Sequence, residues 1–478
     1  MQNKVRDAKF IHALLPILFL TSIIFYGLIL RPLQFGQASL PLEIIFILAA
    51  TFIIVELMVL GHSWDSIQAS IISKIAKAFP AFLILFSIGL IIGSWMICGT
   101  IPMLVYYGLK LINPKFIYLL AFLIPIVFSS LTGTSWGSVG SIGIVLMGIA
   151  LAMDAHLGIT AGAIIGGAFF GDKMSPLSDT TNMAAIAAEV DLFDHIRSMM
   201  YTTVPSTAAA AVIYLALGFI YPPQINTADY ATVAPFLESL ESMFAFNILL
   251  ILPPLIVLVG SVSGKPTIPV LVIATLAASV LAMLFQSYTL GDLFQSLYKG
   301  FTTDMAHWAV QPPEKVVQLL NRGGLYTLSE AVIIAFTVFC FIGAMDMINA
   351  MPMVVNRVFN FARKRWNVIA SSLVAAGITN ALTSNQYATS FIVGDAFKNK
   401  YDKLGISRKV LSRSLEDTGT MIESLVPWHP TAVFMVATLG VPFADYWHWQ
   451  FLSMINMSIA FLWAITGIGC FMNSDKKG

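Results

Sequence analysis

Eight polar residues crowd into one short stretch of an otherwise apolar chain. They lie within the eleven positions from Asp172 to Asn182, with Pro176 among them. Carboxylates, hydroxyls and amides offer oxygen ligands, which hard cations prefer. The candidate ion or substrate ligands in this stretch are Asp172, Ser175, Ser178, Asp179, Thr180, Thr181 and Asn182, and Na⁺ is predicted at Asp172 and Asp179.

The same residues also have a purely structural interpretation. Ser178 and Asp179 are good N-cap residues for a helix that starts near Thr180, because their side chains accept hydrogen bonds from free backbone N–H groups. Lys173 either balances the charge of Asp172 or Asp179, or extends its ammonium group toward the membrane interface. The residues alone leave both interpretations open.

Two Thr-led polar clusters follow apolar segments in the two halves of the chain. TGTSWGS begins at Thr132, and TSNQYATS begins at Thr383. Ser and Thr often form hydrogen bonds between packed membrane helices, which is the alternative to binding an ion. Further candidate ligands are Thr132, Thr134 and Ser135 in the first cluster, and Thr383, Ser384, Asn385 and Gln386 in the second.

The second half also has its own acidic segment, SLEDTGTMIESLVPWHP, which starts at Ser414. Its order in the chain corresponds to that of GDKMSPLSDTT in the first half. Histidine titrates near neutral pH, so His429 could carry a transported proton itself. The candidates for carrying protons or for supporting the ion ligands are Lys173, Asp346, Glu416, Asp417, Glu423 and His429.

Composition indicates a membrane protein. Of 478 residues, 58% are hydrophobic and 11% are charged, against about 25% charged residues in soluble domains. A net charge of +1 without a polybasic run argues against nucleic acid as a partner. Neither HExxH nor a glycine-rich phosphate loop is present, and the three cysteines lie far apart in apolar runs. We therefore expect no enzyme activity and no cofactor, with Na⁺ and H⁺ as transported ions.

The predicted fold is an all-α polytopic membrane protein with about 10 to 13 membrane segments. Non-helical backbone at membrane depth is tolerated only where it is buried in protein or lines a cavity. We expect residues 62–79 to lie on the membrane surface and a helix from Gly158 to break at Gly171. The predicted parts are N-terminal helices (1–60), a first repeat (61–221), a connecting loop (222–245), linking helices (246–287), a second repeat (288–450) and a C-terminal helix with a tail (451–478).

The two repeats show in the sequence itself. At an offset of 250 residues, Gly93 matches Gly343 and Pro102 matches Pro352. At an offset of 251, the Thr-led clusters align, with Trp136 opposite Tyr387. Interrupted segments at corresponding places in two halves are typical of secondary transporters with a site near the membrane midplane.

GDKMSPLSDTTNMA closely resembles the signature of the NhaC family of bacterial Na⁺/H⁺ antiporters, within the ion transporter superfamily. TGTSWGSVGSIGIVLMGIA, NRGG and LSRSLEDTGT resemble further segments of that family. The resemblance extends from about Gly61 to Trp428 and implies inverted repeats whose re-entrant or broken tips meet the transported ion. His429 and Pro430 depart from the family pattern, which has Asn after Pro-Trp, and this puts the exact cation and the stoichiometry in question.

We therefore expect alternating-access exchange of Na⁺ for H⁺ through a shared carboxylate site. The alternative is Na⁺- or H⁺-coupled transport of a small organic carboxylate or amino acid. An intramembrane protease is a remote alternative, since G-x-S-x-G at Gly133 lacks the α/β sheet that this motif needs. Expected partners are the lipid bilayer and the two ions, with an organic solute and a homodimer left open.

Basic residues predict the orientation in the bacterial inner membrane. Lys4, Arg6 and Lys9 precede the first span, Lys74 and Lys77 follow the second, and six Lys and Arg residues lie within 398–413. Basic residues near membrane segments favour the cytoplasm. We therefore expect a cytoplasmic N-terminus.

Overall fold

A computed structural model describes residues 5–224 and 230–472 of the chain, and every named element in those ranges is helical. The helices of the first half are α1 (Phe10–Ile24), α3 (Leu42–Val59), α4 (Trp64–Ile97), α5 (Thr100–Leu111), α6 (Ile117–Thr132), α7 (Ser135–Ser138), α8 (Ile144–Ala152), α9 (Leu157–Met174), α10 (Asp179–Ala187) and α11 (Leu192–Ile220). Those of the second half are α12 (Tyr230–Met243), α13 (Leu252–Val262), α14 (Thr267–Phe285), α15 (Leu290–Lys299), α16 (Glu314–Leu320), α17 (Ser329–Asp346), α18 (Ala350–Val358), α19 (Arg365–Thr383), α20 (Gln386–Lys403), α21 (Arg408–Ser414), the π-helix η7 (Leu415–Thr420), the 3₁₀ turn η8 (Glu423–Leu425), α22 (Pro430–Leu439), α23 (Phe443–Tyr446) and α24 (Phe451–Thr466).

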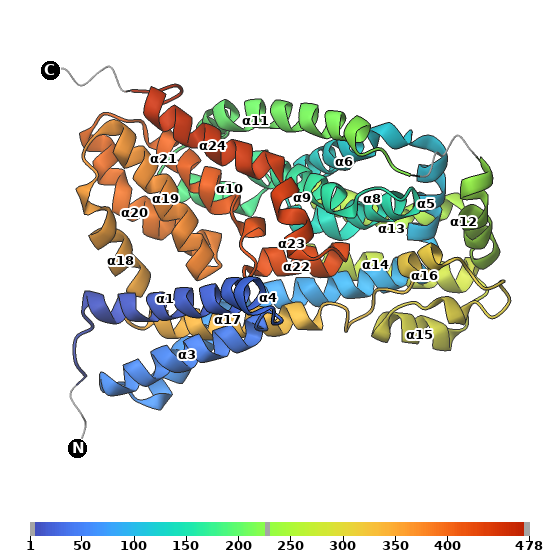
Figure 1. Ribbon diagram of the computed structural model, residues 1–478, viewed down its shortest axis with the longest axis horizontal. Helices are drawn as coiled ribbons and strands as arrows, with labels where there is room; N and C mark the ends of the chain where they lie inside the picture. The colour runs from blue at the N-terminus through green and yellow to red at the C-terminus, as the bar shows by residue number, and fades with distance from the viewer. Residues whose placement is uncertain (1–4, 225–229, 473–478) are drawn as a thin grey trace.

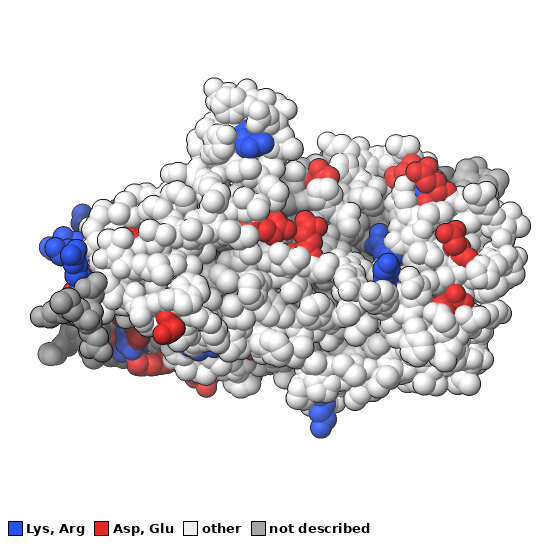
Figure 2. Space-filling model, turned by 90° about the horizontal axis from the view of Figure 1, so that it is seen from below, with Lys and Arg blue, Asp and Glu red and all other residues white. Residues whose placement is uncertain are grey.

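Many of these helices are long and apolar enough to cross a membrane. Eight qualify by length and composition within the described residues, and ten if two bent pairs are each taken as one span. This agrees with the lower end of the predicted range. The long face drawn in Figure 2 is mostly uncharged, and its Lys and Arg residues are few and far apart. Such a surface suits contact with lipid, so the chain is a multi-pass membrane protein.

The helices run mainly along the long axis of the molecule (Figure 1). The segments α18, α20 and α21 gather at one end, together with the first and last described residues, and α5, α12, α15 and α16 gather at the other. Helix α6 enters from the second of these ends and α19 from the first, so their C-terminal tips meet in the interior. The functional candidates on both tips are thereby brought together.

Local sequence explains where the interior helices stop. Helix α6 ends at Thr132 because Gly133 adopts φ +70°, a left-handed conformation that closes helix C-termini. Helix α9 ends at Met174, since Ser175 precedes Pro176 and is extended, with ψ of 133°. The predicted break at Gly171 was therefore placed too early, because glycine without a following proline does not end this helix.

Helix α4 corrects another expectation. Residues 62–79 do not form a separate surface piece, because α4 continues through Pro80 as one helix of 34 residues. Lys74, which makes the first part look amphipathic, is buried and forms an ion pair of 2.8 Å with Asp346 at the end of α17. The pair lets a charged helical face pack inside the protein.

The structure also bears on the predicted connecting loop and on the predicted repeats. The segment predicted as a connecting loop (222–245) includes helix α12, and its residues 225–229 lie outside the described part, as does Lys4. Left-handed breaks occur at matching offsets, Gly99 with Asn349 at 250 residues and Gly133 with Ser384 at 251. These matching breaks support two homologous halves, which remain a proposal, as does their inverted orientation.

Candidate functional site

A cavity of about 390 Å³ lies where the two tips meet. Its walls come from α4, α9, α10, both tips and the segment around α22. Polar groups from both halves face this space, so the structure brings half of the fourteen candidate ligands to one cavity. The polar and charged lining residues are Lys77, Thr134, Asp172, Asp179, Thr180, Ser384, Asn385, Gln386, Tyr387, Glu423, His429 and Thr431, with Trp136 among the apolar ones.

Asp172 is a buried carboxylate in the wall of this cavity. Its side chain is buried, and the hydroxyl of Ser135 donates to its Oδ2. The hydroxyl of Ser178 donates to the other oxygen, Oδ1, at 3.0 Å. Two hydroxyl groups, one on the first tip and one directly before α10, therefore fix the carboxylate at the cavity wall.

The hydroxyl groups that follow the break between α9 and α10 have a role that was included neither in the ion-binding interpretation nor in the N-cap interpretation. Thr180 and Thr181 donate to the carbonyl oxygen of Asp172, at 3.3 and 2.9 Å, and Thr181 also donates to that of Lys173. These carbonyls belong to the last turn of α9, which has no intrahelical partners for them. Ser178 is the N-cap residue of α10 but makes no side-chain capping bond. Ser175 donates to the carbonyl of Ser130, and Asn182 to those of Pro176 and Ser178.

Each tip is closed by the same pair of bonds. In the first, Thr132 and Ser138 hydroxyls lie 3.3 Å apart, and Thr134 accepts from the N–H of Gly137. In the second, Thr383 and Thr389 hydroxyls also lie 3.3 Å apart, and Asn385 accepts from Ala388 N–H at 2.8 Å. Most of these side chains are therefore committed to the tip itself.

Ser384 differs from its neighbours. Its φ is +48°, and its Oγ is buried without a hydrogen-bond partner in the described structure. Because the residue also lines the cavity, this oxygen is free to bind an ion there.

Two aromatic residues cross between the halves. The hydroxyl of Tyr387, on the second tip, donates to Oδ2 of Asp179 in the first half. Trp136, on the first tip, donates to Thr431 of the second half at 3.4 Å and stacks on Phe434. Neither residue was selected as a site residue from sequence, although their alignment at offset 251 was a usable signal.

Asn380 connects Glu423 to its polar neighbours in the second half and was missed entirely. Its amide donates to Gly419 O at 2.7 Å and to Glu423 Oε1 at 3.1 Å, and also to Gln386. Its amide oxygen lies 3.4 Å from Nε2 of His429. A lone Asn three residues before Thr383, inside an apolar span, was the only sequence signal.

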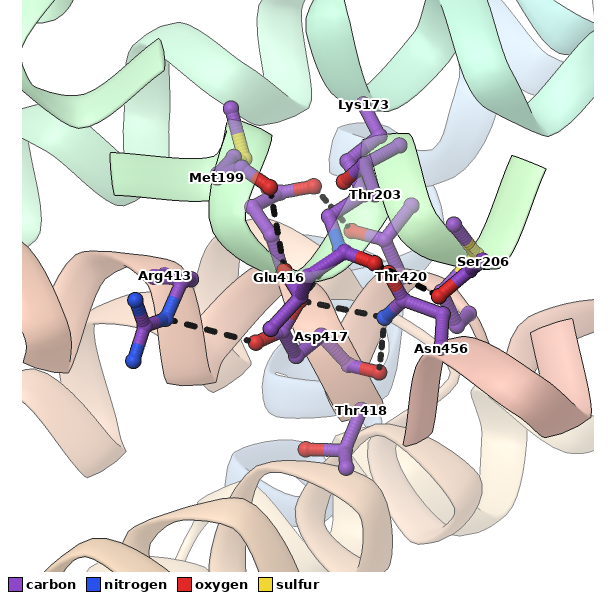
Figure 3. A network of polar contacts seen from close by, with 12 residues as sticks. Lys173, Met199, Thr203, Ser206, Arg413, Glu416, Asp417, Thr418, Thr420 and Asn456 are labelled. Carbon is purple, nitrogen blue, oxygen red and sulfur yellow. Dashed lines mark hydrogen bonds and ion pairs between the residues drawn. The ribbon is translucent and has the colours of Figure 1, made fainter. Parts of the chain in front are cut away.

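Lys173 turns away from this cavity. It is fully buried, and its ammonium group forms an ion pair with Asp417 and donates to Asn456 at 2.9 Å (Figure 3). The expectations that it pairs with Asp172 or Asp179, or reaches the interface, were both wrong. Consecutive residues of a helix point about 100° apart, so Asp172 and Lys173 face different surroundings.

Asp417 is the centre of that second network. Its Oδ1 accepts from Thr202 at 2.8 Å and from Asn456 at 3.0 Å, while Arg413 Nε lies 3.6 Å from Oδ2. Asp346, in contrast, lies outside both polar clusters, where it pairs with Lys74 and is 47% exposed.

The cavity has the chemistry of a hard-cation site. Carboxylates, hydroxyls and amide oxygens converge on it, whereas no group of three His, Cys, Asp or Glu residues arranged for a metal ion occurs among the described residues. Oxygen donors of this kind suit alkali or alkaline-earth cations rather than zinc or copper. Together with the fold, they define a secondary transporter of the membrane.

Comparisons identify its family. The sequence profile of the Na⁺/H⁺ antiporter family matches residues 167–468. An uncharacterized Na⁺/H⁺ antiporter of Haemophilus influenzae is 38% identical over 442 residues, 92% of this chain and 94% of that one. The Na⁺/H⁺ antiporter NhaC of Alkalihalophilus pseudofirmus is 32% identical over 434 residues, 91% of each chain. The malate-2H⁺/Na⁺-lactate antiporter of Bacillus subtilis is 32% identical over 410 residues, 85% of this chain and 86% of that one. The chain belongs to the Na⁺/H⁺ antiporter family, as the NhaC resemblance predicted.

Proposed function

We propose that the protein exchanges Na⁺ for H⁺ across the bacterial inner membrane by alternating access, with Asp172 as the Na⁺-binding carboxylate. The observation that carries this proposal is the position of Asp172 in a cavity lined by both tips. Hydroxyls of Ser135 and Ser178 fix its orientation, and Asp179 adds a second carboxylate to the same cavity. A bound Na⁺ and a bound proton both neutralise such a site, so their binding is antagonistic.

The orientation follows from the distribution of basic residues. Arg6 and Lys9 directly precede α1, which begins at the end of the molecule that also holds α20 and α21 (Figure 1), and Lys398, Lys400 and Arg408 belong to those two helices. Basic residues concentrate on the cytoplasmic side of bacterial membrane proteins. We therefore propose that this end and the N-terminus are cytoplasmic.

Transport in proteoliposomes tests the proposal. An imposed Na⁺ gradient should drive proton movement without any organic solute, and Asp172→Asn should reduce that movement to the background of empty vesicles. Asp154→Asn is the matched control, because Asp154 pairs with Lys315 far from the cavity. Wild-type rates in Asp172→Asn would refute the proposed site.

A second candidate is Na⁺- or H⁺-coupled transport of a small organic solute. The cavity of about 390 Å³ lies within the range of small-molecule sites, ~300–1,000 Å³, and far exceeds one ion. Lys77 lines its edge and would attract a carboxylate, and the Bacillus subtilis relative is named for malate and lactate. Proton movement that requires malate, lactate or an amino acid would favour this candidate.

A further inference from the structure

Glu416, on the π-helix η7, is a second buried acid outside the Asp172 cavity. Its side chain is 0% exposed, and its Oε2 accepts from Thr420 Oγ1 at 2.7 Å. Its Oε1 is buried and has no hydrogen-bond partner in the described structure. An ionised oxygen in that position is costly unless a proton or a compensating charge satisfies it. π-Helical turns are also frequent at functional sites.

The charges beside Glu416 are paired. Lys173 binds Asp417, and Arg413 approaches the other oxygen of the same carboxylate. Asp172, which directly precedes Lys173 in the sequence, adds a second negative charge. Asp172 and Lys173 both act electrostatically on Glu416. Lys173 and Arg413 are thus balanced by Asp417 and Asp172, and Glu423 is a further acid that acts on Glu416. A negative charge on Glu416 therefore exceeds the nearby positive charge while Asp172 is empty, and this excess falls by one charge when Na⁺ neutralises Asp172.

We infer that Glu416 is the proton-binding group coupled to Na⁺ binding at Asp172, with Lys173 and Asp417 as the fixed charges between them. The inference rests on the proposed Na⁺/H⁺ exchange. As Na⁺ enters, the O–H bond of Glu416 breaks, the electron pair stays on the carboxylate, and the proton passes to the solution. Departure of Na⁺ reverses the step. One Na⁺ then exchanges for one proton although the two ions occupy different carboxylates.

A polar face of α11 provides the route for that proton. His195, Ser198, Thr202 and Thr203 recur at helical spacing on its buried side, and each is 0% exposed. Ser198 Oγ and Thr203 Oγ1 are also buried without partners, while Thr202 donates directly to Asp417. Figure 3 draws Thr203 together with Glu416 and Asp417. Buried polar atoms left without partners in this way are places for water, which carries protons along a chain of hydrogen bonds.

Other ionisable groups surround Glu416 and set the background for its titration. Those that face it or its immediate neighbours are Asp172 and Lys173 from α9, His195 from α11, Tyr401 from α20, Arg413 from α21, Asp417 from η7 and Glu423 from η8. Among them Asp417 is held by a Lys and an Arg, whereas Glu423 has hydrogen-bond donors on both oxygens. Glu416 is distinguished from these two acids by its unpartnered oxygen.

Calorimetric Na⁺ titration of the purified full-length protein tests the inference. Titrations in buffers of different ionisation enthalpy give the number of protons released per Na⁺ bound. At pH values below the one at which Glu416 loses its proton, we expect the wild type to release close to one proton per Na⁺ bound. The Glu416→Gln variant should release almost none while still binding Na⁺. Glu416→Asp should restore release, because it keeps a titrating carboxyl group. Undiminished release from Glu416→Gln would overturn the inference and assign the proton to Asp172 itself.

A second variant keeps the test decisive if Glu416→Gln does not fold. Thr420→Val retains the acid but removes the hydroxyl that stabilises its ionised form. The pH of half-maximal proton release should then rise, and an unchanged pH would contradict the inference. A wild type that binds no Na⁺ at all would instead overturn the proposed function, and with it this inference.

Discussion

The two tips around the cavity have the same construction but different freedom. Both end a helix in a left-handed residue, Gly133 in the first and Ser384 in the second, and both are closed by a pair of hydroxyls. A Cβ on Gly133 would lie 2.7 Å from the backbone of Leu177, so this tip is packed against the broken segment. Ser384 adopts its conformation despite its side chain, and leaves a hydroxyl oxygen unpaired. The first tip thus supports Asp172, whereas the second leaves a hydroxyl oxygen without a partner beside the cavity.

The largest effect should come from Gly133→Ala. The left-handed conformation costs a residue with a Cβ about 1–2 kcal/mol, and overpacking against Leu177 adds roughly 1–3 kcal/mol. We expect a clear drop in the unfolding temperature and loss of transport. Ser384→Gly is the matched variant, and it should be as stable as the wild type because it relieves the equivalent conformation. Equal stability of Gly133→Ala and the wild type would remove the contrast between the tips.

Ser384→Ala should separate binding from stability. The variant loses one oxygen that faces the cavity, and a bond to a charged group contributes about 1.5–3 kcal/mol, so Na⁺ should bind at least roughly tenfold more weakly. Folding should change little. Calorimetric Na⁺ titration measures the effect, with Ser130→Ala as the control, since that hydroxyl only bonds Ile126 O of its own helix. Unaltered Na⁺ affinity would exclude Ser384 as a ligand.

Substitutions of the two aromatic residues that connect the halves should also differ in their effect on Na⁺ transport, with the larger effect on the second tip. Tyr387→Phe removes the hydroxyl that competes with Na⁺ for Asp179, so the KM for Na⁺ should fall about fivefold, which corresponds to ~1 kcal/mol. Trp136→Phe retains the ring that stacks on Phe434 and loses only a long bond of 3.4 Å. Its KM should change less than twofold. A larger effect from Trp136→Phe would mean that the first tip, and not the second, controls the site.

The smallest effect concerns the charged end of the molecule. Glu189, between α10 and α11, pairs with Lys398 at 3.1 Å and with Arg408, which links the first half to the second. Hydrogen bonds from Lys398 and then Arg408 lower the pKa of Glu189 below its ordinary value of 4.5. The ionised form therefore stabilises the fold above about pH 4.5, and this contribution is lost as pH falls through the lowered pKa.

Glu189→Gln should accordingly unfold at a slightly lower temperature than the wild type at pH 7 and low salt. The difference should shrink in high salt, because exposed ion pairs are screened. It should also disappear as pH falls through the lowered pKa of Glu189, where the wild-type carboxyl group becomes protonated. A difference that persists in acid would point to packing instead of charge.

The sequence predicted local features well and long-range pairings poorly. Apolar runs and Pro176 act within a few residues, so the existence of the helices and a break near the end of α9 could be predicted from them, whereas the two tips were expected from the family resemblance. The partner of Lys173 lies 244 residues away in the chain. That pairing depends on how α9, α11 and η7 pack, and no local pattern contains this information. For the same reason Asn380 and Asn456, single amides inside apolar spans, were overlooked.

Helix α4 has a consequence for the transport cycle. Its 34 residues correspond to a rod of about 51 Å, and its residues line two cavities: Lys77, Ala81 and Ile84 the central one, and Ile84 and Ile88 a neighbouring space of about 260 Å³. Asp179 also lines both. Because an unbroken helix does not fold away to let an ion pass, we expect opening toward either side to involve movement of the tips relative to α4. Helix α4 would then be the fixed reference against which displacement of the tips is measured.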